Sequence, residues 1–290
     1  MTASAPLLVS GLSAIAPSYE GILCDVWGVL HNGVSAFEPA HQALSTFRKE
    51  AGGAVVLITN APRPNAPIRD QLANLGVPLD AYDDIVTSGD VTRDLLSANA
   101  GATLLHIGPE RDLPLYDDTG VILGSEDDAT LISCTGMFND ETETPDDYRD
   151  QLEALAKRGL TMICANPDIV VERGDRLIWC AGALARLYEE LGGTVSILGK
   201  PHTPIYKAAT DRLAAVRGGP VDPKKILAVG DGLPTDIRGG VAQDLDVLFI
   251  TGGIHAADFG AVDSPDETLI QQRLAEEGLH ARAAVPRLVW

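Results

Sequence analysis

The strongest constraint on the fold is a series of short, almost wholly apolar segments that alternate with helical segments along the chain. The apolar segments lie at 21–26, 53–59, 194–199, 224–230 and 246–251. Helical segments lie between them, at 38–52, 64–76, 203–216 and about 235–243. Strands that are apolar throughout are typical of a parallel sheet covered by helices on both faces. The sequence therefore predicts an α/β fold.

The middle of the chain has the same alternation in a more compact form. Three apolar segments crowd into 103–135, a fourth lies at 160–165, and helices are expected over 144–159 and about 178–191. Thr144 is a candidate N-cap, with Pro145 at the first helical position. We interpret this stretch as a second α/β module inserted in the first. The expected division is a core of 1–88 and 189–290, with an inserted domain of 89–188.

Composition excludes several classes of protein. The net charge of −19 over 290 residues makes binding to nucleic acid or to an anionic membrane a poor prospect, because both need a basic face. The four cysteines lie far apart without a CxxC pair, which argues against a zinc site or a disulfide framework. The N-terminus lacks the features of a secretory signal, and no apolar run is long enough for a membrane span. We expect a cytoplasmic protein.

Polar residues follow several of the predicted strands. Asp25 ends the first, Thr59 and Asn60 end the second, and Asp231 follows Gly230; Lys200 comes after the segment at 194–198. Ligands of open α/β sheets bind outside the carboxyl ends of the strands, so these side chains are expected to converge. Two carboxylates, a hydroxyl and an ammonium suit Mg²⁺ and a phosphoryl group.

Each of these residues also has an ordinary structural explanation. An Asp after a strand is commonly a turn or a helix cap, and a single Lys is usually a solvated surface residue. Asp236 could support the first turn of its own helix. The combination of four such elements on successive strand ends is what favours a site.

Four motifs together resemble the haloacid dehalogenase (HAD) superfamily. They are DVWGVL at 25–30, LITN at 57–60, GKP at 199–201 and GDGLPTDI at 230–237. The long insert between the second and third, with ANPD at 165–168, resembles the type IIA branch. That branch holds the NagD-like sugar-phosphate and nucleotide phosphatases and the pyridoxal phosphate phosphatases. The resemblance implies a Rossmann-like doubly wound core with an inserted α/β cap.

The resemblance also implies roles for the residues. Asp25 would be the nucleophile that forms an aspartyl-phosphate. Asp25, Asp231 and the backbone carbonyl of Trp27 would hold Mg²⁺. Thr59 and Asn60 would bind the phosphoryl oxygens.

The third and fourth motifs and the insert would supply the remaining roles. Lys200 would offset charge on the nucleophile and the phosphate, and Asp236 would position Lys200 or a metal-bound water. Asn166, Pro167 and Asp168 would face the substrate from the cap. Closure of the cap would exclude water.

Trp27 departs from the family pattern. Phosphatases of this superfamily usually carry a second Asp two residues after the nucleophile, where it protonates the leaving alcohol. Trp has no exchangeable proton for that task. His31 is a candidate substitute acid, although a structural role for this histidine is the stronger interpretation.

Two functions therefore stand open. The first is a Mg²⁺-dependent hydrolase of small phosphorylated metabolites; the second is a phosphometabolite-binding or regulatory protein that has lost turnover. A dehalogenase fits the metal-type fourth motif and the large insert poorly, and an oxidoreductase lacks GxGxxG after the first strand. The sequence does not reveal the substrate, and a homodimer is expected only by family analogy.

Overall fold

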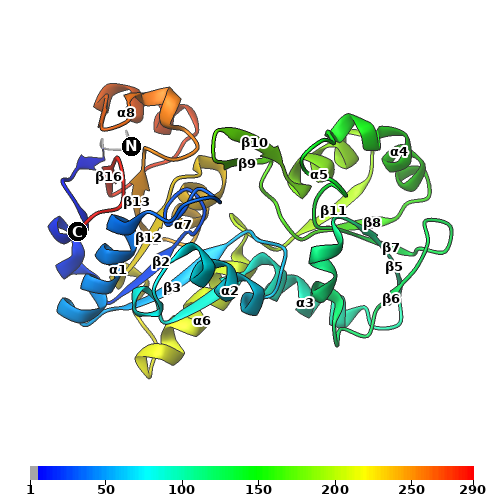
Figure 1. Ribbon diagram of the computed structural model, residues 1–290, viewed down its shortest axis with the longest axis horizontal. Coiled ribbons are helices and arrows are strands. Elements are labelled where there is room, and N and C mark those ends of the chain that lie inside the picture. The colour runs from blue at the N-terminus through cyan, green and yellow to red at the C-terminus, as the bar shows by residue number, and fades with distance from the viewer. Residues whose placement is uncertain (1–5) are drawn as a thin grey trace. The chain divides into compact units, whose positions relative to one another are not determined.

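The computed structural model describes residues 6–290. Residues 1–5, which the sequence assigned to the core domain of 1–88, lie outside the described part. The chain divides into two compact units, which Figure 1 shows with their elements labelled. The first unit comprises residues up to Thr59, Arg69–Val86 and Tyr206–Trp290; the second comprises Asn60–Ile68 and Thr87–Ile205.

The first unit is built on a seven-stranded sheet in the order β1-β16-β13-β12-β2-β3-β4. Its strands are β1 (Leu7–Leu8), β2 (Gly21–Cys24), β3 (Ala54–Thr59), β4 (Asp84–Thr87), β12 (Ile226–Gly230), β13 (Asp246–Ile250) and β16 (Ala283–Val285). The pairs of β2 with β3 and with β12 are parallel, and every residue of these three strands is buried. Burial of both strand faces explains why these segments are apolar throughout.

Helices connect these strands, and those over 38–50, 65–75 and 203–217 agree closely with the expected bounds, whereas the helix over 267–276 was not expected. The helices are α1 (Glu38–Glu50), α2 (Asn65–Leu75), α6 (Thr203–Arg217), α7 (Arg238–Ala242) and α8 (Glu267–Glu276). The helix expected over about 235–243 is divided, because a π-helical turn at Leu233–Ile237 precedes α7. A small antiparallel pair, β14 (Gly260–Ala261) with β15 (Ser264–Pro265), lies before α8. The α/β fold with a parallel sheet is confirmed.

The strand order reverses at β2. From β2 the chain adds β3 and then β4 on one side, whereas β12, β13 and β16 follow on the other side. A reversal of this kind is a topological switch point, outside which open α/β sheets bind their ligands. The carboxyl ends of β2 and β12 flank this point.

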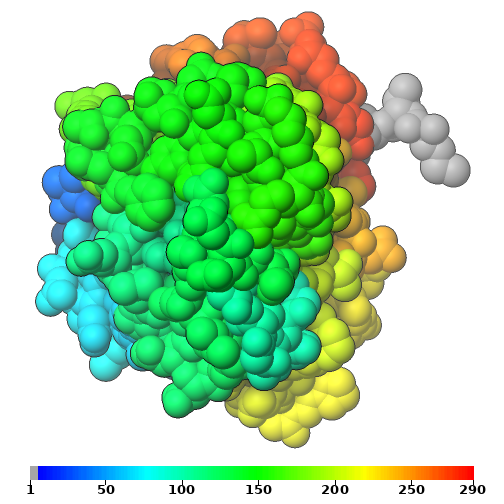
Figure 2. All heavy atoms as spheres, turned by 90° about the vertical axis from the view of Figure 1, so that its right-hand side faces the viewer, coloured from blue at the N-terminus to red at the C-terminus, as the bar shows by residue number. Residues whose placement is uncertain are grey.

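The second unit has its own five-stranded sheet, in the order β11-β8-β7-β5-β6. The strands are β5 (Thr103–Ile107), β6 (Ile122–Leu123), β7 (Leu131–Cys134), β8 (Thr161–Cys164) and β11 (Thr194–Ile197), and all their pairings are parallel. The helices are α3 (Ser88–Ala98), α4 (Arg149–Lys157) and α5 (Ala181–Glu190). Figure 2 shows the surface of this unit in green.

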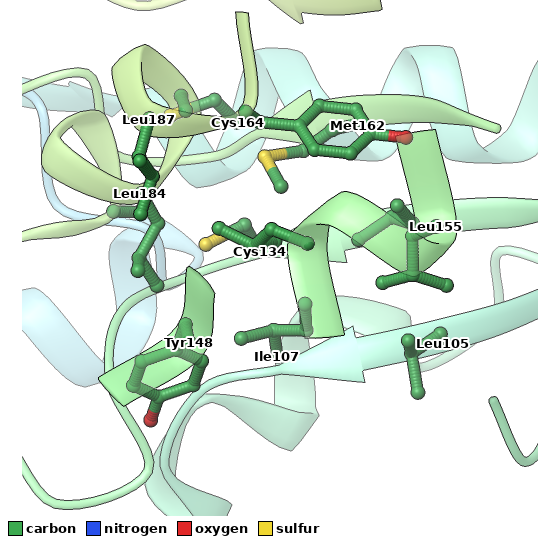
Figure 3. Packing of buried hydrophobic residues seen from close by; sticks show 14 of the residues in the cluster. Leu105, Ile107, Cys134, Tyr148, Leu155, Met162, Cys164, Leu184 and Leu187 are labelled. Carbon is green, nitrogen blue, oxygen red and sulfur yellow. The ribbon is translucent and has the colours of Figure 1, made fainter. Parts of the chain in front are cut away.

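An apolar core joins the sheet of the second unit to its helices. Leu105, Ile107, Cys134, Met162 and Cys164 from the strands pack with side chains of α4 and α5, as Figure 3 shows. The N-terminal end of the segment at 144–159 has the expected cap: Thr144 and Asp147 form a capping box around a short 3₁₀ turn that precedes α4. All four cysteines are free and buried.

Two expectations about the middle of the chain need correction. The helix expected from about residue 178 begins only at Ala181, because Arg176–Trp179 is strand β10, which pairs with β9 (Val170–Arg173) in an antiparallel hairpin. The strand at 194–197 pairs with β8 and not with the core sheet. The expected border at 188/189 therefore does not coincide with the border between the units.

The segment after β3 also groups with the second unit. Gly89 N donates to Ala61 O, and Asn65 N donates to Asp90 Oδ1, so the start of α3 holds this segment. No helix of the described chain, residues 6–290, is long and apolar enough to cross a membrane.

Candidate active site

Three of the predicted site residues lie at or just past the carboxyl ends of neighbouring strands of the first unit. Cys24 in β2 is level with Leu57 in β3 and with Val229 in β12. Asp25 is therefore one residue past this level, and Thr59 and Asp231 are each two residues past it. The sheet register brings these polar groups to one edge, at the switch point. Asp25, Thr59 and Asp231 are all nearly inaccessible to solvent.

Asp25, Asp231 and Asp236 form a buried acidic cluster. One carboxylate oxygen of each lies within 4.8 Å of the others. Oxygens bound to one Mg²⁺ lie at most about 4.2 Å apart, because each Mg–O bond is about 2.0–2.1 Å long, so a small shift of the side chains would bring the three oxygens into one coordination sphere. Asp236 was expected to position Lys200 or a water, and the structure adds its carboxylate to the cluster itself. The side chains are 4–6% exposed, so their mutual repulsion is weakly screened.

Backbone amides fix one oxygen of two of these carboxylates. Ile254 N donates to Asp231 Oδ2 at 2.8 Å, and Gly232 N donates to Asp236 Oδ2 at 3.1 Å. The π-helical turn at Leu233–Ile237 carries Asp236 back toward the end of β12, where its side chain packs on Gly230. These bonds hold the carboxylates in place at short mutual distances.

Two glycines make room for the Asp231 carboxylate. A Cβ atom on Gly28 would lie 2.2 Å from Asp231 Oδ2, and one on Gly253 would lie 2.0 Å from the same atom. Gly28 also has φ +82°, which an L side chain rarely adopts. Both positions therefore require glycine for this carboxylate to stay where it is. Gly253 follows β13, a strand end that none of the sequence motifs indicated as part of the site.

The donor set fits a hard divalent cation. Three buried carboxylates repel one another unless a cation or protons compensate them, and oxygen-only ligands are those that Mg²⁺ and Ca²⁺ prefer. Asp25, Asp231 and Asp236 are the residues of the described chain that could hold it. Coordination of the cation by the backbone carbonyl of Trp27 stays a prediction.

The loop after β2 packs Trp27 against His31. Their ring centroids are 4.9 Å apart with edge-to-face geometry, and His31 is 1% exposed whereas Trp27 is partly exposed. Gly33 N donates to His31 Nδ1 at 2.9 Å. Burial lowers the pKa of His31 to about 4. The imidazole is therefore neutral at pH 7, with its proton on Nε2.

This environment argues against His31 as the substitute acid. A histidine with a pKa of about 4 holds almost no second proton near neutrality, and a proton on Nδ1 would face the Gly33 N–H. The structural interpretation of His31 is the better supported one.

The remaining predicted residues lie in the second unit and form a cluster of their own. Asn60 Oδ1 accepts from Lys200 N at 2.7 Å, and Asn60 Nδ2 donates to Asp168 Oδ1 at 2.8 Å. Asn166 Oδ1 accepts from Asp168 N, and Pro167 lies against Gly199. Lys200 follows β11 rather than a strand of the core sheet, so the expectation that four strand ends of one sheet carry the site is wrong in this respect.

Comparison with known proteins assigns the family. Residues 22–122 match the haloacid dehalogenase-like hydrolase family, and residues 197–276 match a HAD-hydrolase-like family. The crystal structure of a haloacid dehalogenase-like hydrolase from Brucella suis is 48% identical and covers 97% of this chain and 100% of its own, with a TM-score of 0.87. This chain belongs to the haloacid dehalogenase-like hydrolases.

A further relative places this HAD-like hydrolase in the NagD-like branch, and a second relative is also a phosphatase. The ribonucleotide monophosphatase NagD of Escherichia coli is 26% identical over 82% of this chain and 90% of its own. The glycerol phosphate phosphatase of Mycobacterium tuberculosis, solved in complex with calcium, is 25% identical and covers 83% of this chain and 68% of its own, with a TM-score of 0.62. The chain is a HAD-like phosphatase of this branch.

Proposed function

We propose that this protein hydrolyses phosphate monoesters of small metabolites in a reaction that depends on Mg²⁺ and uses Asp25 as nucleophile. The observation that carries the proposal is the buried cluster of Asp25, Asp231 and Asp236 at the switch point, with oxygens within 4.8 Å of one another. The HAD-like family supports the same chemistry.

The reaction proceeds in two displacements at phosphorus. An Asp25 oxygen attacks the phosphorus atom, the bond from phosphorus to the ester oxygen breaks, and the alcohol leaves after taking up a proton. Water then attacks the aspartyl-phosphate, gives up a proton, and releases inorganic phosphate with Asp25 regenerated. A bound divalent cation would neutralise the charges of the carboxylates and the phosphoryl oxygens.

The chain's own residues prepare these steps. Asp231 and Asp236, held by the Ile254 and Gly232 amides, would keep the cation beside Asp25. Thr59, at the buried end of β3, would donate its hydroxyl hydrogen to a phosphoryl oxygen. For Lys200, the charge-neutralising role rests on the sequence motif.

The substrate class comes from the relatives. The Escherichia coli phosphatase is named for ribonucleotides, the Mycobacterium tuberculosis one for glycerol phosphate and a Staphylococcus saprophyticus one for sugar phosphates, so we propose a nucleotide or a sugar phosphate. Pyridoxal phosphate stays an expectation from the sequence motifs. The catalytically impaired alternative receives no support from relatives that are named as phosphatases. A cytoplasmic site of action agrees with four free buried thiols, and a homodimer stays a prediction.

A phosphate-release assay over a panel of esters tests the proposal. Wild type with Mg²⁺ should release phosphate, EDTA should abolish the release, and Asp25→Asn should show none. Asp246→Asn is the matched control in the same sheet, because Asp246 accepts from Tyr19 outside the cluster. Release that persists in Asp25→Asn, or that does not depend on a divalent cation, would contradict the proposal.

A further inference from the structure

The Asn60 carboxamide joins two segments far apart in the sequence. Its Oδ1 accepts from Lys200 N at 2.7 Å, and its Nδ2 donates to Asp168 Oδ1 at 2.8 Å and more weakly to Lys200 O at 3.4 Å. Asn60 is 2% exposed, and Lys200 is equally buried. The oxygen and the NH₂ group of the side chain are therefore both engaged inside the second unit.

The Asp168 segment is itself held firmly by close packing. Gly182 N donates to Asp168 O at 3.1 Å, and a Cβ on Gly182 would lie 2.2 Å from Pro167 O. On the other side, a Cβ on Gly199 would lie 2.7 Å from Asn60 Oδ1 and 2.8 Å from the Pro167 ring. Glycines thus allow the ANPD segment to pack between the start of α5 and the residue before Lys200.

We propose that Asn60 and Asp168 are positioning residues that hold the main chain of Lys200, and that neither reaches the substrate through its side chain. The catalytic part of this inference rests on the function proposed above, in which Lys200 neutralises charge. It leaves the phosphate contact expected of Asn60 to groups other than its side chain, and it replaces the substrate contact expected for Asp168.

Chemistry explains why an amide stands at this position. The site presents one N–H donor from Lys200 and two acceptors, the Asp168 carboxylate and the Lys200 carbonyl. A carboxamide meets both kinds of partner, because it carries an acceptor oxygen and a donor NH₂ group. A carboxylate would satisfy the Lys200 amide but would face Asp168 with a second negative charge. A buried donor or acceptor that is left without a hydrogen-bond partner lowers the stability of the fold.

A reciprocal exchange of the pair tests the proposal. The four proteins are wild type, Asn60→Asp, Asp168→Asn, and the N60D/D168N double variant, assayed with nitrophenyl phosphate and Mg²⁺. In Asn60→Asp two carboxylates meet, and kcat should fall about tenfold to a hundredfold because Lys200 is displaced. KM should change less. In Asp168→Asn the amide oxygen can still accept from Asn60, so the loss should be smaller.

The double variant decides the question. It restores the hydrogen bond with donor and acceptor exchanged, so its kcat should exceed that of Asn60→Asp severalfold. If Asn60 instead binds the phosphoryl group, or if the Asp168 charge binds the substrate, the two losses will accumulate and the double variant will be no better than Asn60→Asp. That result overturns the proposal.

Two further measurements separate this inference from the proposed function. The melting temperatures of the four proteins should show the same recovery in the double variant; the absence of recovery refutes the contact even if no ester is hydrolysed. Asn99→Asp is the matched control, because it removes a single bond to Leu95 O and has no described link to Lys200. If wild type releases no phosphate from any ester, the proposed function fails, and the melting series still tests the pair.

Discussion

Replacing Asp231 by Asn should stabilise the metal-free protein and abolish its stabilisation by Mg²⁺. In the absence of a cation, the cluster holds three acidic side chains with oxygens within 4.8 Å. Two unit charges at 4.8 Å repel by about 3.5 kcal/mol at an effective dielectric constant of about 20. Removing one charge removes two of the three pair repulsions, which together amount to about 7 kcal/mol for fixed, fully charged side chains at this separation.

The net gain will be smaller, because the side chains relax and the charges attract protons and counterions. The amide oxygen of Asn can still accept from Ile254 N, so that bond at 2.8 Å need not be lost. We expect at least about 1 kcal/mol, which corresponds to a rise in melting temperature of about 2–4 °C. In wild type, Mg²⁺ at a hundredfold excess over its Kd should add about 2.7 kcal/mol.

Thermal unfolding in EDTA and in a Mg²⁺ series measures both effects. Asp83→Asn is the matched control in the first unit: it removes the ion pair with Arg48 and should lower the melting temperature. Repulsion within the cluster is not what limits stability if metal-free Asp231→Asn melts below wild type, and the cluster is not the cation site if the melting temperature of this variant rises with Mg²⁺ as much as that of wild type.

Three further predictions concern the loop after β2. The first sequence motif predicts that Trp27 replaces the usual general acid of the family, a group that contributes about 10²–10⁴ in rate. Alkyl phosphates should then turn over much more slowly than nitrophenyl phosphate, and Trp27→Asp should raise alkyl-ester turnover if its melting temperature is kept. Similar high rates for both esters in wild type would contradict this. Burial lowers the pKa of His31 from 6.5 to about 4, so as the pH falls the unfolded chain binds the additional proton before the folded chain does. The neutral, buried imidazole therefore contributes to the free energy of unfolding above pH 6.5, and this contribution is lost as the pH falls toward 4. It amounts to about 3 kcal/mol, and a His31→Gln variant should lose the corresponding slope of melting temperature against pH; an unchanged slope would contradict the assignment. Gly28→Ala should remove phosphate release and the Mg²⁺-dependent melting shift together, because its Cβ would lie 2.2 Å from Asp231 Oδ2; retention of either would show that the loop moves aside at little cost.

Local sequence patterns were sufficient to predict the strands of the core sheet and the proximity of two acidic residues at its edge. The apolar segments that became β2, β3 and β12 are local signals, because strands buried on both faces must be apolar at every position. Parallel pairing then brings their carboxyl ends to one edge, so the proximity of Asp25 and Asp231 follows from the pattern alone. The helices were also predicted from local signals, because the spacing of apolar residues indicates a helix and Pro and Gly mark its ends.

Contacts between segments far apart in the chain, and not local patterns, set which sheet a strand joined. The segment at 194–197 looks like the core strands in the sequence, yet it pairs with β8 in the second unit. The hairpin of β9 and β10 has no periodic signal that distinguishes Arg176–Trp179 from the helix after it. Partner choice between strands depends on contacts distant in the sequence, which local patterns do not encode.

The contacts of two polar side chains also depend on the packing of segments that are distant in the sequence. Asp236 enters the acidic cluster because a π-helical turn carries it back over the end of β12. The Asn60 side chain meets Lys200 and Asp168, which are 140 and 108 residues away in the chain. A motif identifies such residues as important, but the partners that satisfy their donors and acceptors, and hence their roles, exist only once the distant segments have packed together.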